Sequence, residues 1–297
     1  MKIPGVICIV FFAVACMRET ASHGLFSFGE GLGEVDKRLD EASGLAASAA
    51  NPGLLWSLND NGNPPEVFLI DQTARIRLVC KLRNVRNRDW EDIAIGAGPK
   101  HGKSYVYVAD IGDNDAQYDF KVIYRFEEPV LSKEKKEIVI KDYDTLVLRM
   151  PDGSRDAETL LIDPLTNDLF IVSKREKEVG LYRCPYPNAG DTSTLEKVST
   201  LHLTSIVAGS VSADGREVLL KSYSKVYYWK RPNKESLTEL LAKEPILLDY
   251  EREPQGEAIA WSRDGGEFYT LSESNGRNAS LIVYKRAASG KTVSGKQ

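Results

Sequence analysis

The chain has little histidine and little cysteine, and both shortages narrow the chemistry open to it. Of its 297 residues only three are His and four are Cys. Zinc centres and Ser–His–Asp triads depend on these side chains, but the histidines are scattered over the chain as His23, His101 and His202. The sequence also has no CxxC pair and no Gly-rich phosphate loop. We therefore expect neither a His-based hydrolase nor a zinc site.

Basic residues are not gathered into a patch either. The chain has 39 Lys and Arg against 43 Asp and Glu, a formal net charge of −4. The basic run Lys133–Lys136 is interrupted by Glu134, and a short run of this kind is usually a solvated loop. Nucleic acids and anionic membrane surfaces need clustered Lys and Arg. We expect no nucleic-acid partner, membrane contact only through a lipid anchor, and a monomer.

One apolar run opens the sequence, and it is too short to span a bilayer. It extends from Ile3 to Ala15 after a single Lys2, which is the length of a signal-peptide core. The Ala15-Cys16 junction resembles a bacterial lipobox, with Ala13 in place of the usual Leu. Residues 1–16 are thus predicted to be a signal peptide that ends in a lipidated Cys16, and residues 17–36 a tether. This predicts a periplasmic or outer-membrane lipoprotein of a Gram-negative bacterium.

From Lys37 onward, short alternating runs are separated by turn signals. The first unit begins at Asp40–Leu45 and continues with the runs Leu54–Leu58, Glu66–Ile70 and Ile76–Leu82. Four short strands in sequence are typical of an antiparallel meander. The second unit repeats the pattern with Glu91–Ile95, Ser104–Ala109, Lys121–Phe126 and a longer Glu137–Leu148. Asp-Gly turns at Asp214-Gly215 and Asp264-Gly265 mark hairpins in the fourth and fifth units.

The units recur at a nearly constant interval. Aligned on their first residue, they start at Glu41, Glu91, Glu158, Val207 and Glu257, in steps of 50, 67, 49 and 50 residues. An insertion over 127–141 accounts for the long step. A period near 50 with four strands per unit predicts an all-β fold, a β-propeller of five four-stranded blades over residues 37–286, with six blades as the alternative.

The fifth unit shows three strands, and the N-terminal side can supply the fourth. A strand near Gly31–Val35 would pair the two ends of the chain and close the ring, which removes an open sheet edge. Helix is expected only around Lys234–Lys243, and residues 287–297 are predicted to be a disordered tail. Cys80 and Cys184 fall in units one and three. Since these units are not neighbours, two separate buried thiols are favoured over a disulfide.

Acidic residues recur at the start of the units. Four of the five begin with a glutamate, and two share the form Arg-Asp-x-Glu. First strands line the channel of a propeller, so these carboxylates are expected to converge on one mouth. Ca²⁺ takes 6–8 oxygen ligands, and the predicted metal ligands are Glu41, Glu91, Glu158, Glu257, Asp60 and Asp110. Alternatively, each glutamate only bonds backbone N–H groups and fixes blade packing.

Several segments resemble secreted bacterial propeller proteins of the SdiA-regulated type and of the phytase-like (esterase-like) group. They are NRDWEDIAIG and PQGEAIAWSRDG at two blade starts, YVADIGDN at a strand end, and the lipobox-like N-terminus. The resemblance extends over residues 39–286 and implies an acidic central channel that holds calcium. The fourth unit departs from it, because Val207-Ala208-Gly209-Ser210 contains no glutamate.

Two functions follow from this pattern. The first is an anchored propeller without enzymatic activity that binds a small molecule or a protein partner at its acidic mouth, with Ca²⁺ as the cofactor. The second is a metal-dependent hydrolase of phosphate esters, lactones or carboxylic esters, in which Asp89 or Asp156 is the base. The shortage of histidine and the missing fourth glutamate favour the first.

Overall fold

The computed structural model describes residues 24–186, 189–190, 192–233, 235–274 and 278–287. The predicted signal peptide with Cys16, the first part of the predicted tether and the tail from residue 288 lie outside these residues. Among the described residues, no helix is both long enough and apolar enough to cross a membrane.

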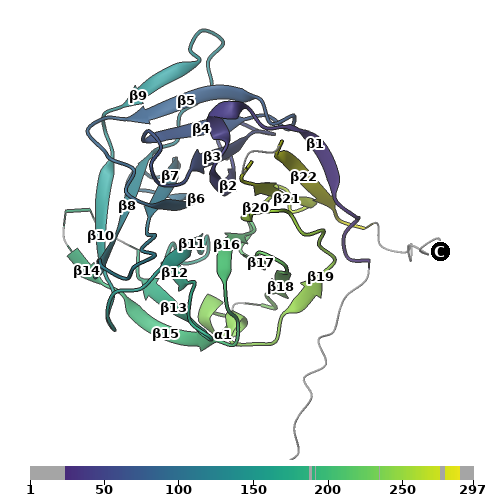
Figure 1. Cartoon of the computed structure of the whole chain (residues 1–297). Coiled ribbons are helices and arrows are strands. Elements are labelled where there is room, and N and C mark those ends of the chain that lie inside the picture. Colours follow the sequence, from purple (N-terminus) through teal and green to yellow (C-terminus); the bar gives the residue numbers. More distant parts are fainter. Residues whose placement is uncertain (1–23, 187–188, 191, 234, 275–277, 288–297) are drawn as a thin grey trace, which may run out of the picture.

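Five small, mainly antiparallel sheets stand in a ring around a central axis (Figure 1). Blade one contains β2 (Ala42–Ala47), β3 (Leu55–Asn59), β4 (Glu66–Ile70) and β5 (Ile76–Leu82). Blade two contains β6 (Trp90–Ala97), β7 (Ser104–Asp110), β8 (Phe120–Glu127) and β10 (Asp144–Arg149). Blade three contains β11 (Ala157–Ile162), β12 (Leu169–Ser173), β13 (Val179–Cys184) and β15 (Glu196–Leu201).

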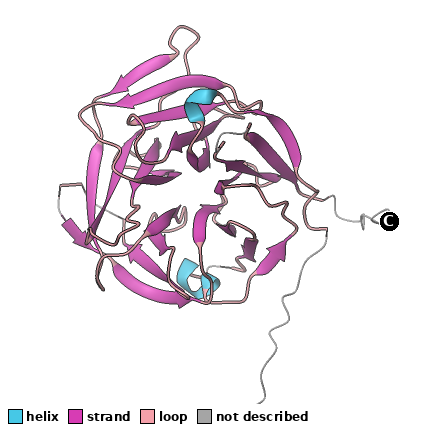
Figure 2. Cartoon of the chain, in the orientation of Figure 1, coloured by secondary structure: helices cyan, strands magenta, loops and turns pink. Residues whose placement is uncertain are grey.

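Blade four contains β16 (Ile206–Val211), β17 (Glu217–Ser222), β18 (Val226–Lys230) and β19 (Ile246–Leu248). Blade five contains β20 (Gly256–Trp261), β21 (Glu267–Ser272), β22 (Ser280–Lys285) and the N-terminal β1 (Glu30–Glu34). Strands make up nearly all the regular structure, as Figure 2 shows. The predicted five-bladed propeller is confirmed.

The N-terminal segment closes the ring, as the sequence predicted. β1 pairs with β22 in antiparallel register from Glu30 opposite Val283 to Glu34 opposite Ser280. Ahead of β1, Phe26 is buried against the rings of Tyr228, Trp261 and Phe268. Residues 24–36 are therefore part of the propeller, and the tether predicted over 17–36 does not extend through them.

Two hairpins show how the sequence sets the blade turns. Ser212 and Ser262 each donate from Oγ to the Asp two residues later, at 2.7 Å in both cases. The following glycines, Gly215 and Gly265, adopt left-handed φ values of 71° and 69°. Glycine carries little steric cost at such φ values, so the repeated Ser-x-Asp-Gly sequence builds the same turn in blades four and five.

The insertion before blade three is the main departure from the predicted strands. Glu137–Leu148 was predicted to be one strand of blade two, and this was wrong. Its first part, β9 (Glu137–Ile140), pairs in parallel with β5 of blade one, and its last part forms β10. Tyr143 lies at the crossing, where its hydroxyl donates to Arg83 O at 2.8 Å and its ring packs edge-on against Tyr124. β9 thereby covers an otherwise open sheet edge.

Three smaller elements complete the fold. β14 (Thr192–Thr194) pairs in parallel with β10, and η1 (Lys37–Leu39) precedes β2. The predicted helix is α1 (Leu237–Leu241), which begins with a capping box between Ser236 and Glu239. Cys80 and Cys184 are buried and free, as predicted, and burial raises the pKa of Cys80 to about 12.

Candidate functional site

Each innermost strand begins with a β-bulge at the same end of the ring. In β6, Trp90 pairs with Asp110 and Asp92 pairs with Ala109, which leaves Glu91 as the extra residue. The same register shift makes the extra residues of the other blades Ser43, Glu158, Val207 and Glu257. Bulges re-aim a side chain out of the regular alternation. The bulges therefore place one ring of side chains at one end of the central channel, and we call this end the mouth.

Blade one differs from the alignment made on the sequence. Ala42 pairs with Asn59 and Gly44 with Leu58, so Ser43 is the residue equivalent to Glu91. Glu41 precedes β2, is exposed, and accepts a hydrogen bond from Asn63 Nδ2. Aligning Glu41 with the other glutamates was wrong by two residues, because only the strand register identifies the bulge.

A second ring of side chains lies beside the bulges. In each blade, the last residue of the second strand pairs with the residue just before the bulge, and the next residue along the chain belongs to this second ring. The five residues of the second ring are Asp60, Ile111, Lys174, Tyr223 and Glu273. The two rings together contain five carboxylates and one ammonium group. Carboxylates therefore dominate the charge of these rings, and blade four contributes only Val207 and Tyr223.

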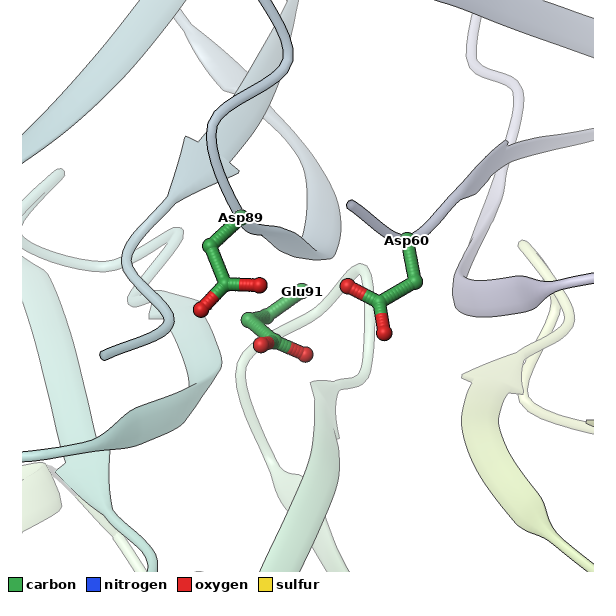
Figure 3. A group of neighbouring side chains, drawn as sticks. All are labelled: Asp60, Asp89 and Glu91. Atoms are coloured by element: carbon green, nitrogen blue, oxygen red, sulfur yellow. The ribbon is translucent and has the colours of Figure 1, made fainter. Parts of the chain in front are cut away.

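Asp60, Asp89 and Glu91 form the first carboxylate group, which we call the blade-one/two group (Figure 3). One carboxylate oxygen from each residue lies within 4.8 Å of the other two. Calcium–oxygen bonds are about 2.3–2.6 Å long, so two ligands of one ion lie at most about 5 Å apart. The group therefore has the spacing of ligands to a single ion.

Glu91, Asp156 and Glu158 form a second group with the same spacing, which we call the blade-three group. Its charge is largely compensated. Lys174 Nζ is hydrogen-bonded to Glu158 Oε1, and Arg175 Nε lies 2.7 Å from Asp156 Oδ2. Asp156 Oδ1 also accepts from the backbone N–H of Asp113 at 2.9 Å.

Glu91 belongs to both groups and has no partner of its own. Its residue is 5% exposed, yet among the described residues no hydrogen bond or ion pair reaches its carboxylate. Burial raises the pKa of Glu91 well above its usual range, and the charges of Glu158 and Asp60 raise it further. The charge of Lys174 opposes this rise but does not cancel it. A buried carboxylate without a hydrogen-bond donor or a directly paired counter-charge is costly, and a bound cation would remove this cost.

The pKa values of the two neighbouring carboxylates, Asp60 and Asp89, are raised as well. Burial and the charge of Asp89 raise the pKa of Asp60 to about 7, although a hydrogen bond from the Asn61 N–H acts to lower it. Burial also raises the pKa of Asp89, whose Oδ1 accepts from Asn61 Nδ2 at 2.7 Å. No Lys or Arg side chain among the described residues pairs with this group, since the nearby Arg88 bonds to Asp110 instead.

Gly112 holds the backbone close against these carboxylates. A Cβ at this position would collide with Glu91 Oε1 and Asp89 Oδ2. The loop after Gly112 is fixed by Asp113, which accepts from the N–H groups of Gln117 at 2.7 Å and Tyr118 at 2.9 Å. Glycine is therefore required for the observed carboxylate positions.

On the side of the mouth formed by blades four and five, the carboxylates have hydrogen-bond partners and no ion pairs with Lys or Arg among the described residues. Tyr223 donates from its hydroxyl to Glu257 Oε1 at 2.6 Å. Burial, followed by a hydrogen bond with Glu257, raises the pKa of Glu273 to about 9. This side therefore holds its carboxylates by hydrogen bonds, without a Lys or Arg partner in the part of the chain that the structure describes.

The structure brings together only some of the predicted site residues. Asp60 and Glu158 each lie beside Glu91, in the blade-one/two and blade-three groups, and Glu257 is bonded to Tyr223 of the neighbouring blade. Asp110 is turned to Arg88, with Oδ1 3.1 Å from Nε. Asp89 and Asp156, predicted as candidate bases, each lie in a carboxylate group. Sequence reasoning missed Lys174, although Ser173-Lys174 aligns with Ser272-Glu273 at the equivalent strand ends.

The channel beneath the mouth is narrow. Inner-strand side chains, including Leu45, Ile93, Leu160 and Trp261, line a central space of about 40 Å³. This volume admits no more than a few water molecules. A ligand must therefore approach the carboxylates from the mouth.

Comparisons with known proteins add little to this geometry. No family model matches the chain, and no curated protein matches it. A chain of the nidogen/laminin complex is similar in structure, with a TM-score of 0.46 and 10% identity over 85% of this chain and 78% of that one. A chain of Kuenenia stuttgartiensis hydrazine synthase has a TM-score of 0.43 and 11% identity over 83% and 84%. Likenesses this distant carry no conclusion about activity or ligand.

Proposed function

We propose that the protein binds one Ca²⁺ ion at Asp60, Asp89 and Glu91 and uses it to hold a ligand or partner at the propeller mouth. The observation that carries the proposal is the Glu91 carboxylate, which is buried and has no partner among the described residues. A divalent cation would supply a counter-charge bound directly to this carboxylate. The surrounding carboxylates support this assignment, because all three point into the same small volume (Figure 3).

The donor set fits calcium and leaves room for a ligand. Three carboxylates supply between three and six oxygens, whereas Ca²⁺ takes 6–8. The remaining positions face the mouth, since the central space behind has room for no more than a few water molecules. Water or an oxygen-rich group of a small molecule or protein partner would fill them. We propose this binding role for an anchored lipoprotein, with Cys16 as the anchor, outside the inner membrane.

Hydrolysis by the same ion is the alternative. It would need a base that is not itself held as a ligand or by a counter-charge. Asp89 lies among the proposed ligands, and Asp156 is paired with Arg175. No specific observation at the mouth favours a base, so the binding function has the stronger support.

Isothermal titration calorimetry tests the proposal. Ca²⁺ is titrated into purified protein freed of metal with EDTA, and the wild type is compared with Glu91→Gln. The matched control is Glu244→Gln, which changes an exposed glutamate between α1 and β19. We expect saturable binding of one ion by the wild type and the control, and none by Glu91→Gln at the same concentrations. Equal binding by all three proteins would refute the site.

A further inference from the structure

Lys174 is the cation of the mouth that the proposed function does not use. It follows β12, its side chain is 11% exposed, and its Nζ is hydrogen-bonded to Glu158 Oε1. The ammonium also lies 5.4 Å from the centre of the Tyr223 ring. Lys174 and Glu158 therefore form a buried ion pair at the mouth.

Its position in the fold is that of an acidic residue in other blades. The residue after the second strand is Asp60 in blade one and Glu273 in blade five, but Lys174 in blade three. The blade-three group, Glu91, Asp156 and Glu158, has the same oxygen spacing as the blade-one/two group. Geometry alone would therefore allow a second ion.

We propose that Lys174 is a built-in cation that takes the place of a second divalent ion, so that the mouth binds one ion rather than two. This inference rests on the proposed function for the first ion. Lys174 and Arg175 together reduce the charge of the blade-three group from −3 to −1. A divalent ion in this group would have to displace the ammonium from the Glu158 oxygen that it needs as a ligand, and the positive charge of Lys174 would repel it.

Removing the ammonium should open the second site. In Lys174→Met, Glu158 loses its counter-charge while its oxygen keeps its place within 4.8 Å of the Glu91 and Asp156 oxygens. Glu91 would then bridge two ions, as carboxylates do in two-metal sites with ions about 3.5–4 Å apart. In the wild type, the blade-three group binds no Ca²⁺, because its cation is the Lys174 side chain, which cannot leave the protein.

The experiment counts bound Ca²⁺ by equilibrium dialysis and calorimetry on the purified full protein. We expect one ion for the wild type, two for Lys174→Met, and one for Lys174→Arg, which keeps the charge. Lys177→Met is the matched control, because Lys177 is an exposed lysine of the same loop, and it should bind one ion. Adding Glu158→Gln to Lys174→Met should restore one.

The outcomes separate this inference from the proposed function. One ion in both the wild type and Lys174→Met would overturn the role of Lys174 and leave the first site intact. No ion in the wild type and one in Lys174→Met would overturn the first site and keep the role of Lys174. No ion in either protein would overturn both. If Lys174→Met does not fold, Lys174→Gln, which still donates a hydrogen bond to Glu158, is counted instead under the same criteria.

Discussion

Glu91 and Glu158 lie at equivalent positions of neighbouring blades but in opposite electrostatic surroundings. Both are the extra residue of a bulge, both follow Arg-Asp-x, and both are buried. Glu158 is bonded to Lys174, whereas Glu91 has no partner among the described residues. The difference comes from the residue after the second strand, which is Ile111 in blade two and Lys174 in blade three. The bulge determines where the glutamate side chain points, and the residue after the second strand determines whether that glutamate is paired with a positive charge.

The same substitution should therefore have opposite effects on the stability of the metal-free protein at the two positions. Glu158→Gln is expected to have the largest effect, because it leaves Lys174 without its carboxylate. Breaking a buried pair costs about 3–5 kcal/mol, and the lower end applies because Lys174 is 11% exposed. Urea unfolding in EDTA should show the loss. A change no larger than that of Glu244→Gln would mean that the pair contributes nothing.

Glu91→Gln should remove the ion and stabilise the metal-free protein. Even changes beside a metal ligand cost about 10–100-fold in affinity, so loss of this central ligand should weaken Ca²⁺ binding by at least about 100-fold. Without metal, replacing an unpaired buried carboxylate should raise the free energy of unfolding by about 1 kcal/mol or more. Calorimetry and urea unfolding measure the two effects. A destabilised Glu91→Gln in EDTA would contradict the view that Glu91 lacks a partner.

Gly112→Ala tests whether the positions of the Glu91 and Asp89 carboxylates determine Ca²⁺ affinity, without changing any charge. Its methyl group would push on Glu91 Oε1 and Asp89 Oδ2, which belong to the blade-one/two group. We expect Ca²⁺ affinity to fall by about tenfold or more, an effect comparable with that of losing a supporting residue. Gly31→Ala is the control, because nothing lies within 4 Å of a Cβ there. Similar affinities for the two variants would show that the carboxylate positions are not tightly set.

A further expected effect is a pH dependence of stability in EDTA. Burial raises the pKa of Asp60 from an ordinary 3.8 to about 7, so the folded protein binds this proton more tightly than the unfolded chain. The contribution of Asp60 to the free energy of unfolding should therefore fall as pH rises from about 4 to 7. Asp60→Asn should flatten this slope in urea titrations. An unchanged slope would show that Asp60 is ionised throughout.

The sequence predicted the ring of five blades well, because each blade carries local signals. Asp-Gly turns, short alternating runs and a period near 50 residues all depend on neighbours in the chain. β9 was misplaced because its parallel pairing with β5 depends on contacts between blades. Nothing in Glu137–Ile140 itself specifies which sheet edge it joins.

The candidate site was predictable in type but only partly in detail. Acidic residues at blade starts indicated a carboxylate mouth, and Asp60 and Glu91 lie there together. Glu41 was aligned in place of Ser43, because a bulge is a property of strand register and not of residue type. The partners of each carboxylate depend on loops that bring distant residues together. Lys174 and Glu158, 16 residues apart, are one such pair.

Thermal unfolding of the wild type and Glu91→Gln, each in EDTA and in Ca²⁺, tests the central claim most directly. An ion that binds only the folded state stabilises it by about 2.7 kcal/mol at 100 times its dissociation constant. The account predicts that Ca²⁺ raises the Tm of the wild type and leaves that of Glu91→Gln unchanged. It also predicts that Glu91→Gln has the higher Tm in EDTA. The absence of a Ca²⁺-dependent rise in the wild type, or an equal rise in both proteins, would contradict a cation site at Glu91.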